Sequence, residues 1–223
     1  MNKRGIEKLA GLFITFEGPD GSGKTTQARL LEKRLQDWGR NVLLVREPGG
    51  TSIGETIREL LLDPSHTEMT VACEVLLYSA ARAQLVIEQI RPALTRGEVV
   101  LSDRYWDSTL VYQGLAGGED LDIIKKINLW ATGDLVPRRT FLLDLAAEQG
   151  LLRVHGAKEG ARPAGGDRVE QKELQFHHRV RNGFLELASR EKERFCIIPA
   201  ANTPQTIHES IWEKVVPLLE DRR

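Results

Sequence analysis

The stretch Gly18-Pro19-Asp20-Gly21-Ser22-Gly23-Lys24-Thr25 decides the fold. It follows the apolar run 12–16 and precedes a segment in which apolar residues recur at helical spacing, at Ala28, Leu31, Leu35 and Trp38. Strand, glycine-rich loop and helix in this order form the context that the P-loop pattern G-x-x-x-x-G-K-[ST] requires. A glycine-rich turn without a ligand is the alternative, and the match at every fixed position and at both flanks weighs against it.

The chemistry of this loop suits a nucleoside triphosphate. Gly18, Gly21 and Gly23 allow backbone conformations that turn successive N–H groups toward one point, which makes a nest for an anion. The helix that begins near Lys24 adds the positive end of its dipole. Lys24 supplies a charge for the outer phosphates, and the Thr25 hydroxyl is suited to a phosphate-bound Mg²⁺.

Length and composition are those of one domain that spans residues 1–223, with an N-terminal extension over 1–11. The chain has 223 residues, of which 41% are hydrophobic and 28% are charged. This is enough apolar material for a full core. The formal net charge of −1 argues against broad electrostatic binding to nucleic acid or to an anionic membrane.

The cysteines and the N-terminus indicate the compartment. Cys73 and Cys196 lie far apart in apolar surroundings, so we expect buried, reduced thiols. Residues 1–11 are polar, and no run in the chain has the length of a signal-peptide core or a membrane span. The expected compartment is the cytoplasm.

Short apolar runs alternate with segments of helical period. The expected strands are 12–16, 42–45, 99–102, 140–143 and 195–198, and the expected helices are 53–62, 68–91, 121–132, 147–154, 169–191 and one from Pro204 onward. Pro92 should kink or restart a helix. The alternation predicts an α/β fold of the P-loop NTPase type, with a mostly parallel five-stranded sheet flanked by helices. Such sheets bind ligands at the carboxyl ends of their strands, where the polar clusters 46–48 and 103–105 lie.

One stretch, from about residue 153 to 168, breaks this pattern. Between Gly156 and Gly166 it has no apolar periodicity, and it carries basic residues in or beside it: Arg153, His155, Lys158, Arg162 and Arg168. It is either a basic lid over the site or a solvated linker with incidental charge.

A P-loop alone does not distinguish switches, motors and kinases. The guanine-reading signature N-K-x-D of GTPases does not occur in the sequence, and translocating ATPases are usually larger. A basic lid together with arginines at strand ends suits phosphoryl transfer between two nucleotides, because two polyanions must be held together.

Several further motifs stand in a specific order. They are Phe16-Glu17, REPGGT at 46–51, EVLLYSAAR at 74–82, DRY at 103–105, DST at 107–109, YQG at 112–114 and DRVE at 167–170. With these motifs the chain resembles the bacterial thymidylate kinases from Phe13 to its final helix. The resemblance implies that ATP, with Mg²⁺, phosphorylates thymidine monophosphate. It also implies a homodimer, formed through the long helices near 68–91.

For the phosphate and the sugar, the resemblance assigns four residues. Arg58 and Arg104 match residues that clamp the monophosphate, where a guanidinium fork fits the phosphate oxygens. Asp20 matches a carboxylate that meets the sugar 3′-hydroxyl, and Tyr112 matches a ring that crowds the 2′ position. Without the resemblance, Asp20 would read as a turn residue and the arginines as ion-pairing groups.

For the base, the resemblance assigns Tyr78, Arg82, Thr109 and Gln113. Tyr78 matches an aromatic residue that stacks on the base, and Arg82 matches one that reads a thymine carbonyl. Thr109 and Gln113 match polar residues near the pyrimidine edge. By pattern alone, Tyr78 would be a core residue, and Thr109 and Gln113 would be ordinary surface polarity.

The family also divides by the origin of its catalytic arginine. The P-loop position that carries arginine in one group is Gly21 here, so the chain resembles the group in which the lid supplies it. The available donors are Arg153, Arg162 and Arg168. Arg153 is the first candidate because it sits on a predicted helix that enters the loop, and for Arg168, beside Asp167 and Glu170, a structural ion pair is the alternative. We expect Lys24 to act on the transferring phosphoryl group and to face solvent in the free protein. Glu47 and Asp103, with Thr25, are the candidates for ordering Mg²⁺, partly through water.

Two rival functions remain open from the sequence. Another nucleotide or deoxynucleoside kinase is the nearest, and Tyr112 with the pair of Arg82 and Gln113 weighs against it. A P-loop switch without phosphoryl transfer is the second, and the basic lid and the second set of arginines weigh against that.

Overall fold

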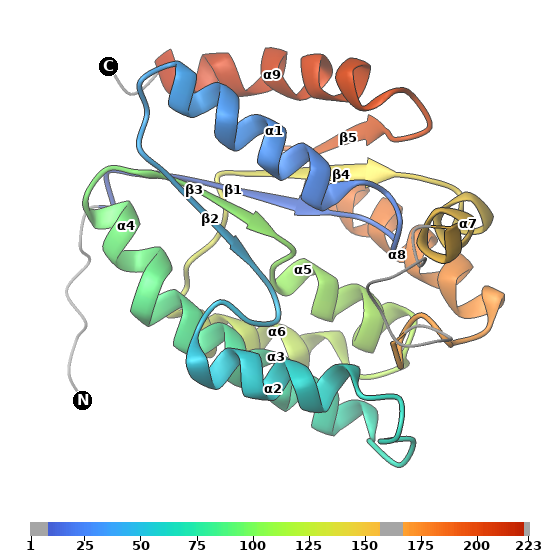
Figure 1. The fold of residues 1–223 in the computed structure, drawn as a ribbon. Helices are drawn as coiled ribbons and strands as arrows, with labels where there is room; N and C mark the ends of the chain where they lie inside the picture. The colour runs from blue at the N-terminus through green and yellow to red at the C-terminus, as the bar shows by residue number, and fades with distance from the viewer. Residues whose placement is uncertain (1–8, 157–166, 221–223) are drawn as a thin grey trace, which may run out of the picture.

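The computed structural model describes residues 9–156 and 167–220. Its sheet has five parallel strands in the order β2-β3-β1-β4-β5 (Figure 1). The strands are β1 (Leu12–Glu17), β2 (Val42–Arg46), β3 (Val99–Asp103), β4 (Arg139–Asp144) and β5 (Phe195–Pro199). This confirms the predicted fold class and all five predicted strands. The centre of the short lid predicted from about 153 to 168, residues 157–166, lies outside the described residues. So do residues 1–8 of the predicted N-terminal extension.

Helices cover both faces of the sheet, because alternate residues of a strand point to opposite sides. Leu12, Ile14 and Phe16 of β1 pack with α1 (Lys24–Asp37) and α9 (Pro204–Glu220). Phe13 points the other way and packs with α4 (Arg91–Thr95) and its neighbours. Figure 1 shows α1 and α9 together over one face and the helices from α2 to α6 on the other.

The remaining helical elements follow the predictions, except for α5, η2 and the beginning of α8. They are α2 (Ser52–Leu62), α3 (Val71–Leu85), η1 (Val86–Ile90), α5 (Trp106–Thr109), η2 (Leu110–Leu115), α6 (Leu121–Thr132), α7 (Ala147–Gly156) and α8 (Leu174–Arg190). The helix predicted over 68–91 passes through η1, a π-helical turn, into α4, where Pro92 lies in the first turn. A new α-helical segment thus begins one residue before this proline, which agrees with the predicted restart.

Two predictions of secondary structure were incomplete. α8 begins at Leu174 and not near 169, because the Asp167 carboxylate accepts the backbone N–H groups of Val169 and Glu170 and holds a turn there. α5 and η2 were not predicted. Nearly all of their side chains are buried, so this stretch has no polar face to reveal a helical period.

The prediction of buried thiols was wrong for Cys73. Both cysteines are free, but Cys73 is exposed on the outer side of the first turn of α3, and Cys196 is half-buried. Among the described residues, no helix has the length and apolar content needed to cross a membrane.

Candidate active site

The P-loop lies where β1 ends, at the carboxyl edge of the sheet. Gly18, Gly21 and Gly23 have φ angles of 140°, 73° and 93°, which an L side chain rarely adopts. Gly23 is the N-cap of α1 in the left-handed conformation, so the first N–H groups of the helix open toward the loop. This backbone fits a phosphate chain, as the sequence pattern requires.

Lys24 does not face solvent, and this prediction was wrong. Its side chain is 7% exposed, and Nζ donates to the carbonyl oxygens of Gly18 at 3.0 Å and Pro19 at 2.8 Å. Burial, and then the nearby charge of Arg104, lower the pKa of Lys24 to about 8. The ammonium group is therefore held under the loop by the loop's own backbone.

The helix α7 lies directly against the P-loop. A Cβ at Gly21 would come within 2.2 Å of the Gly150 carbonyl oxygen, and a Cβ at Gly150 within 2.3 Å of the Asp20 carbonyl oxygen. No side chain fits at either position unless the two backbones separate. One group of thymidylate kinases carries an arginine at the position of Gly21. In this chain the packing of α7 against the P-loop requires glycine there.

Arg153 extends from α7 toward the same place. Its Nη1 donates to the Ala200 carbonyl oxygen at 3.1 Å and, at the limit of hydrogen-bond distance, to that of Gly21 at 3.5 Å. The side chain is exposed at the rim of the site. Of the two other lid arginines, Arg162 lies outside the described residues, and Arg168 is described below.

Arg104, Asp20 and Tyr112, predicted from three separate motifs, lie together. Arg104 Nη2 donates to an Asp20 carboxylate oxygen and, at 3.2 Å, to the Tyr112 hydroxyl. That hydroxyl donates to the other Asp20 oxygen at 3.0 Å. Burial alone would raise the pKa of Asp20, but the charges of Arg104 and Lys24 hold it below its ordinary value.

The backbone of Arg104 is strained at the point where its side chain lines the cavity. Its φ is 74°, which is uncommon for a residue other than glycine and costs about 1–2 kcal/mol. The Arg104 N–H donates to the Phe16 carbonyl oxygen at 3.0 Å, which ties this turn to the end of β1.

Glu17, quoted above only as part of a motif, supports the same turn. The carboxylate is fully buried and accepts the Tyr105 N–H at 2.7 Å and the Ser108 hydroxyl at 2.6 Å. Ser108 Oγ in turn accepts from Arg104 Nη1 at 3.0 Å. Burial, followed by the charge of Asp107, raises the pKa of Glu17 to about 8. A glutamate that ends an apolar strand was the available signal for this role.

Arg58 stands on α2 at the same cavity. Its Nη1 donates to the Pro48 carbonyl oxygen at 3.0 Å, and Arg46 Nη1 donates to the same oxygen at 3.1 Å. Burial, and then the charge of Arg46, lower the pKa of Arg58. Two arginines thus converge on the loop that follows β2.

At the far end of the cavity Arg82 is 2% exposed and has three partners from different elements. Its Nε donates to Glu47 Oε2 at 2.7 Å, Nη2 donates to Thr109 Oγ1 at 3.2 Å, and Nη1 donates to Asn128 Oδ1. Burial raises the pKa of Glu47 to about 7 against the opposing effect of Arg82. Asn128, on α6, is a partner that the sequence did not indicate.

Tyr78 is half-buried on α3 between Glu74 and Arg82, one turn from each. Burial, and then the charge of Glu74, raise the pKa of its phenol to about 12, so the ring remains neutral. Gln113 is buried on η2 and donates from Nε2 to Glu74 Oε2 at 2.7 Å.

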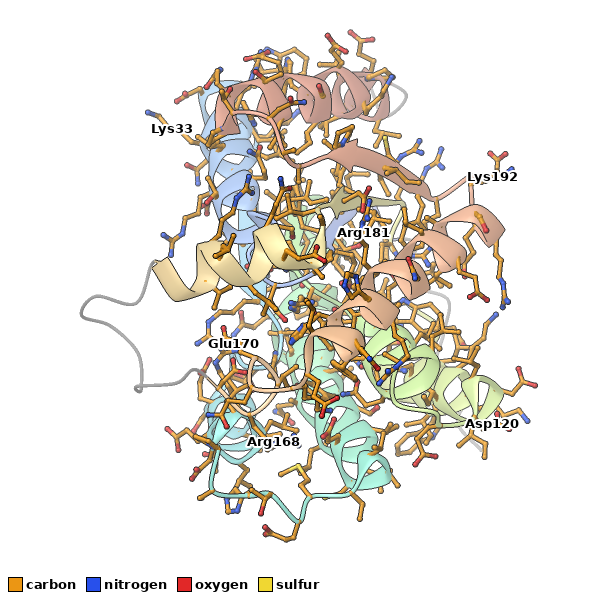
Figure 2. All side chains as sticks on the ribbon, turned by 90° about the vertical axis from the view of Figure 1, so that its right-hand side faces the viewer. Lys33, Asp120, Arg168, Glu170, Arg181 and Lys192 are labelled. Carbon is orange, nitrogen blue, oxygen red and sulfur yellow. The ribbon has the colours of Figure 1, made fainter. Side chains whose placement is uncertain are left out.

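Arg168 does not reach into the cavity. Its Nη1 donates to Glu74 Oε1 at 2.6 Å and its Nε to the Leu61 carbonyl oxygen at 3.1 Å. Figure 2 labels Arg168 beside the layer formed by α2 and α3. This geometry supports the ion-pair alternative for Arg168 over a part in phosphoryl transfer.

The residues expected to order a metal do not form one cluster. The Thr25 hydroxyl donates to the Asp103 carboxylate beside the P-loop, whereas Glu47 is engaged by Arg82. The described residues contain no group of three or more His, Cys, Asp or Glu side chains that could hold a metal ion. One hydroxyl and one carboxylate beside a phosphate loop nevertheless fit Mg²⁺, which keeps several waters and shares its other ligands with phosphates.

A cavity of about 730 Å³ connects these groups. It runs from the P-loop past Arg104 to the end bounded by Tyr78, Arg82 and Gln113. Of the predicted site residues, all line it except Gly18, Pro19, Ser22 and Arg168. The volume and the two polar ends suit two ligands held end to end.

The chain is similar to thymidylate kinases in every comparison. Residues 16–211 match the family described as thymidylate kinase. The chain is 50% identical over 205 residues to the thymidylate kinase of Deinococcus radiodurans, covering 92% of this chain and 96% of that protein. It is 47% identical over 207 residues to that of Halothermothrix orenii, with 93% and 97% covered. The crystal structure of thymidylate kinase from Ehrlichia chaffeensis superposes with a TM-score of 0.73, at 31% identity and 92% and 98% coverage.

Proposed function

The chain belongs to the thymidylate kinase family, and from this premise we propose how its cavity performs the reaction. The enzyme transfers the γ-phosphoryl group of ATP to the phosphate of thymidine monophosphate and releases ADP and thymidine diphosphate. The observation that carries the proposal is one continuous cavity among the described residues, with the P-loop at one end and a partly aromatic polar pocket at the other.

ATP is placed with its phosphates in the P-loop. The N–H groups at the start of α1 and the Lys24 ammonium bind the β- and γ-phosphates. For Lys24 this means exchanging the carbonyl oxygens of Gly18 and Pro19 for phosphate oxygens, since these are the nearest of its present acceptors and Ser22 Oγ is the third, at 3.4 Å. Thr25 and Asp103 would hold Mg²⁺, which when bound neutralises charge that develops on the phosphates.

Thymidine monophosphate is placed with its phosphate between Arg104 and Arg58. Arg104 then exchanges part of its contact with Asp20 for the phosphate, and the freed Asp20 oxygen accepts the sugar 3′-hydroxyl. Tyr112, fixed by both residues, limits the space at the 2′ position. Tyr78, Arg82, Thr109 and Gln113 surround the base.

Transfer requires positioning and charge stabilisation by these groups, with no covalent enzyme intermediate. Lys24 stabilises charge on the moving phosphoryl group from inside the P-loop. Arg153, whose rim position is maintained by α7, supplies the cation from the lid side. In this proposal the catalytic part of the segment predicted as a lid, about 153–168, is Arg153 on α7, and the centre of that segment lies outside the described residues.

The proposed enzyme is a cytoplasmic homodimer. Large apolar side chains are exposed on α2, α3, η1 and α6, which belong to the layer of helices over one face of the sheet (Figure 1). They are Ile53 at 56%, Leu60 at 43%, Leu76 at 59%, Ile87 at 58%, Ile123 at 56% and Trp130 at 82%. A second copy that covers this layer would remove them from water. The near-neutral net charge gives no general attraction to nucleic acid.

A coupled assay for ADP, with thymidine monophosphate present and absent, tests the reaction. We expect ADP only when both nucleotides and Mg²⁺ are supplied. ADP release that ignores thymidine monophosphate would favour a P-loop switch. Faster turnover of uridine monophosphate or of a deoxynucleoside would favour one of the other kinases.

A further inference from the structure

Glu74 lies behind the base end of the cavity and joins three elements. It stands in the first turn of α3 and is 2% exposed. Its Oε2 accepts from Gln113 Nε2 of η2 at 2.7 Å, and its Oε1 accepts from Arg168 Nη1 at 2.6 Å. Lys172 Nζ is 3.9 Å from Oε1. The reaction as described above gives Glu74 no role.

These contacts decide which way the Gln113 amide points. A carboxylate paired with arginine accepts hydrogen bonds and donates none, so the amide nitrogen must face Glu74. The amide oxygen is then the atom left for a ligand, and Gln113 lines the cavity. Among the described residues, the hydrogen bond found for the Gln113 side chain is the one that its Nε2 donates to Glu74, so its oxygen is available to a ligand.

The carboxylate itself cannot turn freely. Arg168 holds one of its oxygens, and Arg168 is anchored in turn by the bond from its Nε to the Leu61 carbonyl at the end of α2. Each oxygen of Glu74 thus has a donor from a different part of the chain. The chain of contacts runs from Leu61 on α2 to Arg168, from Arg168 to Glu74, and from Glu74 to Gln113, and it fixes the direction of the Gln113 amide.

A fixed amide oxygen distinguishes one class of pyrimidine from another. Thymine and uracil present an N–H donor at N3, whereas cytosine presents a bare acceptor nitrogen there. We propose that Glu74 is a positioning residue that sets base choice by presenting the Gln113 oxygen to the N3–H of the thymine base. The inference rests on the proposed binding of thymidine monophosphate at this end of the cavity.

Replacing Glu74 by glutamine should reverse the amide. The new side chain has one oxygen. We expect it to accept from Arg168 and not from the neutral Gln113 amide, because a hydrogen bond from a charged donor is the stronger of the two. Its NH₂ group then faces Gln113 and needs an acceptor. Gln113 meets this need by turning its oxygen toward position 74 and its own NH₂ toward the base, where it opposes the thymine N3–H and suits the cytosine N3.

The test compares kcat/KM for thymidine monophosphate and deoxycytidine monophosphate in the parent enzyme and in Glu74→Gln. We expect the ratio to fall by roughly 10- to 100-fold, the cost of one unsatisfied buried polar group. The loss should appear in KM for thymidine monophosphate, with a gain for deoxycytidine monophosphate and an unchanged KM for ATP. Arg82 still opposes the cytosine amino group, so the preference should narrow and not invert.

Two further variants keep the test decisive. Glu186→Gln makes the same change at an exposed glutamate paired with Arg190 and should leave the ratio unchanged. The double variant Glu74→Gln, Gln113→Glu restores an acceptor oxygen toward N3, so it should return the ratio to within about threefold of the parent. If Glu74→Gln does not fold, the double variant carries the test alone.

The outcomes separate this inference from the proposed function. A Glu74→Gln ratio within twofold of the parent, or equal losses for both substrates, overturns the inference, because Glu74 would then be structural only. A double variant that folds but does not prefer the thymine base overturns it as well. If the parent enzyme itself does not phosphorylate thymidine monophosphate, the proposed function has failed instead.

Discussion

Replacing Gly150 by alanine should move α7, the helix that carries Arg153, away from the P-loop while leaving the fold intact. Gly150 lies within α7, where its N–H donates to the Ala146 carbonyl oxygen at 3.0 Å. A new Cβ there would meet the Asp20 carbonyl oxygen at 2.3 Å. The position of the Cβ is fixed by the backbone and the Asp20 oxygen is part of the backbone, so neither can be moved aside by a change of rotamer.

The distances set the size of the effect. Carbon and oxygen pack at about 3.5 Å, so α7 and the P-loop must separate by roughly 1 Å. Overpacking of this kind costs about 1–3 kcal/mol. Alanine in place of glycine returns about 1 kcal/mol through helix propensity. The net loss of unfolding free energy should therefore not exceed about 2 kcal/mol. A displacement of about 1 Å in a positioning element can nevertheless lower turnover by about 10²-fold.

The assay is kcat at saturating ATP and thymidine monophosphate, with thermal unfolding measured in parallel. Gly156→Ala is the matched control, because Gly156 ends the same helix and a Cβ there meets nothing within 4 Å. If the effect acts through Arg153, adding Gly150→Ala to Arg153→Ala should lower kcat little further. A Gly150→Ala enzyme with kcat within twofold of Gly156→Ala would refute the reasoning.

Three further predictions follow from buried charges. Lys24→Ala should keep its fold by circular dichroism but lose about 10²–10³-fold in kcat, as expected for one electrostatic group at the transferring phosphoryl; near-normal turnover would remove the P-loop lysine from the mechanism. Because burial and Arg104 lower the pKa of Lys24 to about 8, its charge is lost as pH rises, so kcat/KM for ATP should fall through about pH 8; a profile that is flat from pH 7 to 9.5 would contradict this. Arg194→Ala should cost about 3–5 kcal/mol in urea unfolding, since it leaves the fully buried Asp107 carboxylate without its bidentate partner. The exposed pair of Arg190 and Glu186 provides the control, where Arg190→Ala should cost about 0.5 kcal/mol or less.

The sequence was sufficient for the sheet and the phosphate loop because both are local patterns. A strand of a covered parallel sheet is apolar on both faces, so all five strands appear as short uninterrupted runs. The P-loop needs glycines at fixed spacing for steric reasons that no partner can change. Residues 46–48 and 103–105 follow two of these strands, so the rule that ligands bind at the carboxyl edge of a parallel sheet predicts their position beside the loop.

What the sequence did not reveal depends on contacts between distant residues. Arg194 sits in the charged run EKER and looks solvated, yet it bonds Asp107, 87 positions earlier. Glu74 was quoted in a motif, but its two partners lie on η2 and after the lid. Lysine side chains usually face solvent, which is why exposure was expected for Lys24. Instead its ammonium group is buried and donates hydrogen bonds to the carbonyl oxygens of its own loop.

The described part of the cavity holds its cations with partners of their own, and this governs how ligands are selected. Arg104 pairs with Asp20, Arg82 with Glu47, and Lys24 with the P-loop carbonyls. A buried charge without a partner would cost several kcal/mol, so these internal contacts allow the cations to be in place before a substrate binds. Each ligand must then supply oxygens that match an existing partner in position as well as in charge. A simple anion lacks oxygens at all of these positions, so it gains little by displacing a carboxylate or a backbone carbonyl. Selectivity in this cavity therefore arises from the exchange of hydrogen-bond partners and not from unpaired positive charge.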